Sequence, residues 1–153
     1  MIGQSPLGRI LALDYGRRRI GIAVSDPFQW TAQPLETWTG GSLAELISHV
    51  NRLIAERNVV KVVVGFPLTL KGDFSESTRR VEAFIRLLEK SVPVPVVRWD
   101  ERLTTVEAAR VLRSMNLSSR DHKGKIDQMA AALLLQSYLS HQDGKPSGLE
   151  EIP

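Results

Sequence analysis

The order of the apolar segments constrains the fold of this chain more than any other feature. Three short runs typical of β-strands come first, at residues 9–14, 19–25 and 34–39. Two more strand-like runs follow, at residues 59–64 and 94–99, and apolar residues recur at helical spacing over residues 43–57, 75–90, 104–115 and 126–139. A strand meander followed by strands joined through helical crossovers predicts an α/β fold. We expect a five-stranded mixed sheet flanked by helices on both faces.

Local signals mark several boundaries of these elements. A short basic turn after Gly16 predicts an antiparallel hairpin between the first two strands. Two glycines break the chain before Ser42, the expected N-cap of the first helix. Thr104 and Glu107 fit a capping box at the start of the third helix, and residues 117–124 are expected to form a polar, basic loop. By analogy, this order of elements is that of the ribonuclease H-like superfold.

Composition indicates one domain with a substantial core. The chain has 153 residues, of which 42% are hydrophobic. We expect the domain to span residues 9–140, with flexible ends at residues 1–8 and 141–153. The absence of cysteine excludes disulfides, a thiolate zinc site and a cysteine nucleophile. No apolar run approaches the roughly 18 residues that span a bilayer, and no signal-peptide core is present, so a soluble, cytoplasmic protein without membrane partners is expected.

The distribution of charge favours a polyanionic partner. The net charge is +3, which many soluble proteins share. Residues 98–125, however, carry seven basic side chains against four acidic ones, and a local excess of this kind can hold phosphates.

Carboxylates stand where the expected strands and helices begin or end. Asp14 closes the first strand, Asp100 and Glu101 close the last strand, and Asp127 opens the last helix. Asp127 heads an apolar stripe that should face the sheet, because its neighbours at i+3, i+4 and i+7 are Ala130, Ala131 and Leu134. Buried carboxylates that converge repel one another, and a divalent cation with oxygen ligands relieves that repulsion.

Each acid also has a purely structural interpretation. Asp14 fits a turn residue before Gly16, and Asp127 fits a first-turn residue favoured by the helix dipole. One member of the Asp100–Glu101 pair is expected to form an ion pair with Arg102 or Arg98. Asp26, before a proline, is expected to be an ordinary turn acid.

Four segments together resemble the YqgF/RuvX family. They are DYGRRRIGIAVSD (14–26), VVGFPLTLKGD (63–73), DERLTTVEAARVL (100–112) and KIDQMAAALLLQSYL (125–139). The resemblance implies a bacterial ribonuclease H-like domain related to Holliday junction resolvases. It also implies a nuclease that matures the 5′ end of precursor 16S ribosomal RNA, with a resolvase acting on branched DNA as the alternative. The sequence departs from the family pattern at Phe66 and Thr69, in the loop after the fourth strand.

The family's acidic positions fall on Asp14, on the Asp100–Glu101 pair and on Asp127. Within the pair we prefer Glu101, because the superfold usually places a glutamate there. The resemblance thus implies that Asp14, Glu101 and Asp127 are catalytic and, with Asp100 as the other candidate ligand, hold one or two Mg²⁺ ions, or Mn²⁺ in their place. The expected contacts to nucleic-acid phosphates are made by Arg17, Arg18, Arg19, Arg102, Lys123 and Lys125. Arg19 has a second interpretation, as cover for the sheet edge.

Several secondary features stay open from the sequence. The Gly65–Gly72 loop follows a parallel strand, where α/β sheets bind ligands, but a tight turn explains it equally well. Trp30 is the tryptophan expected to stack on a base if any does, and the three histidines have no metal-ligand spacing.

Two rival functions and the oligomeric state also remain open. An ATPase of the actin-like kind shares the D-x-G pattern but needs a second domain, for which this chain leaves no room. A non-catalytic module that binds nucleic acid or the ribosome and its precursors would use the acids only for structure. A resolvase needs two active sites facing opposite strands and is therefore expected to be a dimer, whereas a nuclease that trims structured RNA is not so constrained.

Overall fold

The computed structural model describes residues 7–104 and 120–142, and its centre is a five-stranded mixed sheet. The strands are β1 (Arg9–Tyr15), β2 (Arg19–Ser25), β3 (Ala32–Thr39), β4 (Val59–Phe66) and β5 (Val96–Asp100). Their order across the sheet is β3-β2-β1-β4-β5. The first three strands form an antiparallel meander, and β4 and β5 add to it in parallel, as the sequence predicts.

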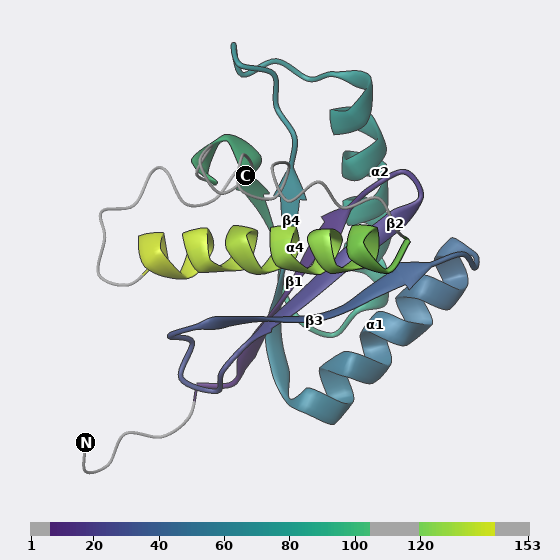
Figure 1. Ribbon diagram of the computed structural model, residues 1–153. Helices are drawn as coiled ribbons and strands as arrows, with labels where there is room; N and C mark the ends of the chain where they lie inside the picture. Colours follow the sequence, from purple (N-terminus) through teal and green to yellow (C-terminus); the bar gives the residue numbers. More distant parts are fainter. Residues whose placement is uncertain (1–6, 105–119, 143–153) are drawn as a thin grey trace.

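Helices cover both faces of the sheet (Figure 1). One face packs against α1 (Leu43–Arg57) and α2 (Glu76–Ser91), and the other packs against α4 (Arg120–Gln142). Alternation along β1 produces the two cores, because Leu11 and Leu13 point to one face while Ile10 and Ala12 point to the other. The short 3-10 helix η1 (Glu101–Leu103) follows β5 directly. The predicted fold class is therefore confirmed.

Capping residues set the starts of the two helices on the α1–α2 face. The hydroxyl of Ser42 accepts a hydrogen bond from the backbone N–H of Glu45 (3.2 Å), and the Glu45 carboxylate accepts one from the backbone N–H of Ser42 (3.0 Å). Ser75 and Thr78 form the same reciprocal arrangement at α2. The predicted N-cap at Ser42 is confirmed.

The last helix begins earlier than its sequence indicates. α4 starts at Arg120, so the loop expected at residues 117–124 is wrong for residues 120–124. Asp127 consequently lies about two turns inside the helix. A first-turn dipole role for Asp127 is thereby excluded, since that effect fades within the first turn. Helical hydrogen bonding propagates at lower cost than it nucleates, so a polar segment joined to a packed helix can continue it.

Some predictions fall outside the described residues. These are most of the flexible ends expected at residues 1–8 and 141–153, and the helix expected after Thr104, at residues 105–115. Residues 141 and 142, expected in the tail, are instead the last two residues of α4. Thr104 itself closes η1, donating its backbone N–H to the carbonyl of Glu101 (3.1 Å). Within residues 7–104 and 120–142, no helix is long and apolar enough to cross a membrane.

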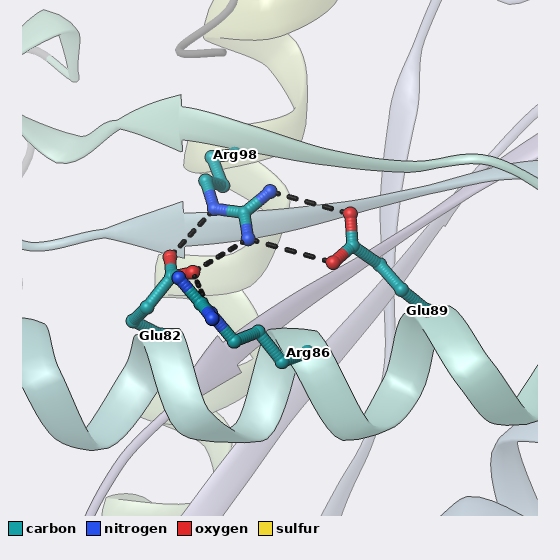
Figure 2. A network of polar contacts seen from close by, with 4 residues as sticks. All are labelled: Glu82, Arg86, Glu89 and Arg98. Carbon is teal, nitrogen blue, oxygen red and sulfur yellow. Dashed lines mark hydrogen bonds and ion pairs between the residues drawn. The ribbon is translucent and has the colours of Figure 1, made fainter.

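A cluster of charges joins β5 to α2 (Figure 2). Arg98 donates to both oxygens of Glu82, at 2.7 and 2.8 Å, and more loosely to Glu89, at 3.3 Å. Arg86 also donates to Glu82, at 2.8 Å. The hydrogen bonds from Arg98 lower the pKa of Glu82 to about 2, and the nearby arginine charges add to that effect.

Replacing Glu82 with glutamine is expected to lower the free energy of unfolding at pH 7 by about 1–3 kcal/mol, the range for hydrogen bonds to a charged group. Because the folded-state pKa lies below the unfolded value, the stabilisation is present above pH 4.5 and disappears as the pH falls toward 2. Urea unfolding from pH 2 to pH 7 measures this. Glu89→Gln is the matched control, since Glu89 is 41% exposed and should contribute less than about 1 kcal/mol. Equal losses for the two variants would contradict the assignment.

Candidate active site

Asp14 lies near the carboxyl end of β1, in the middle of the sheet. It pairs with Gly21 on β2, and its side chain is partly buried. Side chains alternate along a strand, so Asp14 shares the face of Ala12, which packs in the core beneath α4. The carboxylate therefore points to the side of the sheet that α4 covers.

Gly21 allows α4 to approach the sheet beside Asp14. A Cβ atom at this position would lie 2.0 Å from the backbone carbonyl oxygen of Asp127, far inside any permitted contact. The backbone of α4 therefore rests directly on β2 at this point, which brings Asp127 to the same end of the sheet as Asp14. Glycine in a strand interior often marks such a close backbone approach.

Gly65 makes room for Glu101 in a similar way. Glu101 is the first residue of η1, and β5 pairs with β4 so that Gly65 lies opposite Trp99. A Cβ atom on Gly65 would lie 2.8 Å from Oε2 of Glu101. The Glu101 carboxylate thus lies over β4, the strand next to β1, and approaches Asp14 from the other side.

The electrostatics of Asp14 and Glu101 show that the acids converge. Burial raises the pKa of Asp14 to about 6, and the negative charge of Asp127 adds to the rise. Burial also raises the pKa of Glu101 to about 7, with the charges of Asp14 and then Asp100 adding to it. Among the described residues, neither Asp14 nor Glu101 has a cationic partner. The site therefore holds unneutralised negative charge.

Asp127 differs from the other two acids because it is already paired. Nε of Arg19 donates to Oδ2 of Asp127 at 2.5 Å, and the two side chains are 36% and 24% exposed. The sequence did not indicate this ion pair, and the phosphate contact expected of Arg19 stays a prediction. Arg19 is the counter-ion of one of the predicted site acids.

Asp100 is engaged in a separate local pair. Its carboxylate accepts hydrogen bonds from the guanidinium of Arg102, the closest at 2.6 Å, and from the Arg102 backbone N–H at 2.9 Å. The prediction that one acid of the pair forms an ion pair with an arginine is confirmed, and Arg98 binds elsewhere. Glu101 is left as the member of the pair that reaches toward Asp14.

The side chains predicted to bind phosphates differ in how far they are available to a ligand. Arg17, Arg18 and Lys125 are exposed, and within the described part of the chain they form no ion pair. Arg102 is held by Asp100 and also reaches the carbonyl of Leu70 at 3.5 Å. Lys123 lies in α4, and its side chain is outside the described atoms.

The Gly65–Gly72 loop is ordered by its own contacts. The hydroxyl of Thr78, at the start of α2, donates to the carbonyl of Pro67. Thr69 accepts from the backbone N–H of Asp73 at 2.9 Å, and Phe66 is buried against Phe74. Of the two departures from the family pattern, Thr69 therefore holds the turn, whereas Phe66 is the last residue of β4 and packs in the core.

The remaining aromatic and acidic candidates lie away from the acids. Trp30 is 64% exposed, but it follows the end of β2 that is opposite to Gly21. Asp26 holds that turn by accepting the backbone N–H groups of three residues, which confirms it as a turn acid. His49 packs against Trp38 and pairs with Glu36.

The carboxylates fit a divalent cation only in part as they stand. In residues 7–104 and 120–142, no three acidic or histidine side chains are gathered closely enough to form a complete metal site. Asp14 and Glu101 supply two oxygen ligands of the kind that Mg²⁺ or Mn²⁺ prefers. Burial is the main cause of their raised pKa values, and the neighbouring negative charges that add to the rise are charges that a divalent cation would offset. Asp127 would complete the set if Arg19 released it.

Comparison with known proteins identifies the family of the chain. The sequence model of the RuvX family, described as Holliday junction resolvase, matches residues 8–141. The chain belongs to the RuvX family. The enzyme class predicted from the sequence, a nuclease that hydrolyses phosphodiester bonds, is confirmed by this membership.

Curated relatives match over nearly their whole length. A protein of Halalkalibacterium halodurans is 44% identical over 139 residues, covering 90% of this chain and 99% of the relative. One of Chloroflexus aurantiacus is 41% identical over 144 residues, covering 94% of each chain. Both carry the name "Putative pre-16S rRNA nuclease".

Among solved structures, RuvC of Thermus thermophilus in complex with a Holliday junction substrate is similar. The TM-score is 0.58 at 15% sequence identity, and the match covers 92% of this chain and 99% of RuvC. This likeness confirms the ribonuclease H-like fold. The sequence predicted this fold, whereas it did not reveal the packing roles of Gly21 and Gly65, for which glycine inside a strand was the available signal.

Proposed function

We propose that this chain is a metal-dependent nuclease that processes the 5′ end of precursor 16S ribosomal RNA. The observation that carries the proposal is the pair Asp14 and Glu101, two partly buried carboxylates with raised pKa values and no cationic partner among the described residues. The curated relatives carry a name that points to this substrate. Such a substrate fits the cytoplasmic location expected from the sequence.

In this proposal, Asp14 and Glu101 hold one or two Mg²⁺ ions, with Asp127 as the third ligand and Asp100 outside the set because Arg102 occupies it. A divalent cation bound there supplies Lewis acidity toward the phosphodiester and its attacking water. Asp14 is held by β1 in the middle of the sheet, and Glu101 by η1, which follows β5 directly, so both carboxylates are positioned by rigid elements as precise metal placement requires. Without a metal ion, Arg19 neutralises Asp127; on metal binding, Asp127 would exchange Arg19 for the cation.

The test is cleavage of a substrate panel with Mg²⁺, Mn²⁺ or EDTA. End-labelled precursor 16S RNA, single-stranded DNA and a four-way DNA junction are incubated with the chain, and product lengths are read on a sequencing gel. We expect cleavage of the RNA at its 5′ leader, supported by Mg²⁺ and abolished by EDTA. Binding of the RNA without cleavage in either metal would make the chain the non-catalytic module and overturn the proposal.

The second candidate function is Holliday junction resolution, favoured by the description of the family model. It requires two active sites that cut opposite strands, and so a dimer. Symmetric cleavage of the junction together with a dimeric mass in light scattering would favour it. An RNA-trimming nuclease is expected to leave the junction intact.

The role assigned to Gly65 gives a further prediction. In Gly65→Ala, the new methyl group should displace the Glu101 carboxylate, because the only contact below 3.0 Å is with the end of that flexible side chain. We expect cleavage to fall about 10- to 100-fold, as when groups that orient metal ligands are lost. The free energy of unfolding should fall by no more than about 1–3 kcal/mol, since one side chain can move. Normal cleavage by this variant would contradict the placement of Glu101.

A further inference from the structure

A pocket opens on the other face of the sheet from the acids, at the same end. It lies between the β1–β2 turn and the start of α1 and has a volume of about 280 Å³. This size is close to the lower limit for ligand sites, roughly 300 Å³. We call it the hairpin pocket, and its lining consists of Tyr15, Gly16, Arg17, Arg18, Ile20, Trp38, Gly40, Gly41, Ser42, Leu43 and Leu46.

The hairpin pocket is positively charged. Among the described residues, Arg17 and Arg18 are the charged residues that line it; both are exposed, and neither has an ion pair there. The nearest acid on α1, Glu45, is turned to the backbone N–H of Ser42 and is occupied there. The two arginines are therefore available to an anion.

The walls of the hairpin pocket are fixed by packing. Tyr15 stacks on Phe84 of α2 with ring centroids 4.2 Å apart, and Trp38 stacks on His49 at 4.8 Å. A phosphate with an attached sugar or base would therefore meet cationic side chains on one side and ordered aromatic rings on the other. Nucleic-acid strands are commonly bound by such combinations of positive charge and aromatic surface.

The pocket is connected to the acids by a single step along β1. Asp14 faces α4, whereas the next residue, Tyr15, faces α2 and lines the pocket. A strand whose phosphodiester lies at Asp14 therefore reaches the pocket by passing over the Gly16–Arg18 turn at the end of the sheet.

We propose that the hairpin pocket binds a backbone phosphate of the substrate strand, close to the bond that is cleaved. The strand crosses the end of the sheet from the α4 face to the α1 face, with Arg17 and Arg18 holding the flanking phosphate. This inference rests on the proposed nuclease function and adds a second contact point, one that fixes the path of the strand.

Two kinds of variant test the pocket, each in an Asp14→Asn background so that binding is measured without cleavage. The first is the double variant Arg17→Gln with Arg18→Gln, matched by Arg52→Gln with Arg57→Gln, two exposed arginines farther along α1. The second is Leu43→Glu, matched by Leu87→Glu on α2. A carboxylate at position 43 lies in the pocket and in the first turn of α1, where the helix dipole tolerates it, so lost binding is not explained by unfolding.

The measurement is fluorescence anisotropy of a fluorescein-labelled RNA containing the 5′ leader, titrated in Ca²⁺ at several salt concentrations. We expect both pocket variants to bind at least about tenfold more weakly, and the arginine variant to lose about one to two units of salt slope, one for each phosphate contact removed. The controls should stay within about twofold of the parent. Unchanged affinity and salt slope in the arginine variant would overturn the proposal.

Inorganic phosphate separates a strand site from a site for free phosphate. We expect millimolar phosphate to compete weakly with the RNA in the parent chain and not at all in the arginine variant. If the parent chain bound inorganic phosphate as tightly as RNA, the proposal that the pocket binds a phosphate of the substrate strand would be contradicted.

The pocket proposal and the nuclease proposal can fail separately, and the experiments distinguish the two failures. The arginine variant is therefore also made with Asp14 intact. Cleavage of the leader RNA by that version with an unchanged KM would support the nuclease function and contradict the pocket. Weaker RNA binding by the arginine variant, together with no cleavage by the parent chain, would support the pocket and contradict the proposed nuclease function.

Discussion

Replacing Asp14 with asparagine is expected to reduce metal-dependent cleavage at least about a hundredfold, because the carboxylate contributes several kcal/mol of charge stabilisation through the metal. The fold should stay intact, since asparagine has nearly the same shape and Asp14 accepts no side-chain hydrogen bond within the described residues. Circular dichroism and a cleavage time course measure the two effects. Undiminished cleavage would end the assignment of this site.

The same variant should be more stable than the parent when metal is absent. The folded-state pKa of Asp14 is raised to about 6, so the folded chain holds this proton more tightly than the unfolded chain. Stability contributed by the protonated acid is present below the unfolded pKa and is lost as the pH rises toward 6. Asparagine avoids that loss, so at pH 8 in EDTA we expect a gain on the order of 1 kcal/mol that vanishes below pH 4.

Two controls test the interpretation of the Asp14→Asn variant. Saturating Mg²⁺ should stabilise the parent more than the variant, because only the folded parent has the full set of ligands. Asp26→Asn is the matched substitution at the opposite end of the sheet. It removes the carboxylate charge and replaces Oδ2, the acceptor of the Phe28 N–H, with an NH2 group, while Oδ1 can still accept from Trp30 and Thr31, so it should destabilise the chain modestly without a specific loss of cleavage. A less stable Asp14→Asn at pH 8 without metal would contradict the electrostatic account.

Among the glycines of the described residues, Gly21 is expected to tolerate alanine least. In Gly21→Ala, the methyl group would lie 2.0 Å from the carbonyl oxygen of Asp127, and a backbone atom cannot yield as a flexible side chain can. Relief requires α4 to move off β2, so we expect a loss on the order of 3 kcal/mol in the free energy of unfolding. Cleavage should fall as well, because Asp127 moves with the helix.

Urea unfolding and calorimetric titration with Mg²⁺ measure the consequences at Gly21. Gly65→Ala serves as the comparison, since it adds the same methyl group against a side chain rather than a backbone. The two variants should therefore differ in stability while both lose activity. Parent-like stability and cleavage in Gly21→Ala would show that α4 does not rest on β2 at this point.

Much of the framework followed from the sequence. Alternating and β-branched runs predicted all five strands, because a strand buried on one or both faces must carry apolar side chains at those positions. Asp14 and Glu101 could be placed at one end of the sheet because β1, β4 and β5 are parallel and end at the same edge. The capping pattern at Ser42 predicted the start of α1 from local hydrogen bonding alone.

Other features depended on contacts between distant segments. Arg19 and Asp127 are 108 positions apart, and no local pattern indicates that they form an ion pair. The polar composition of residues 117–124 predicted a loop, yet the chain is helical from residue 120. The sequence thus determined which acids are present and which strands carry them. The tertiary structure decided which acids are neutralised and how closely α4 approaches, because ion pairing and backbone packing depend on distances in space and not on spacing along the chain.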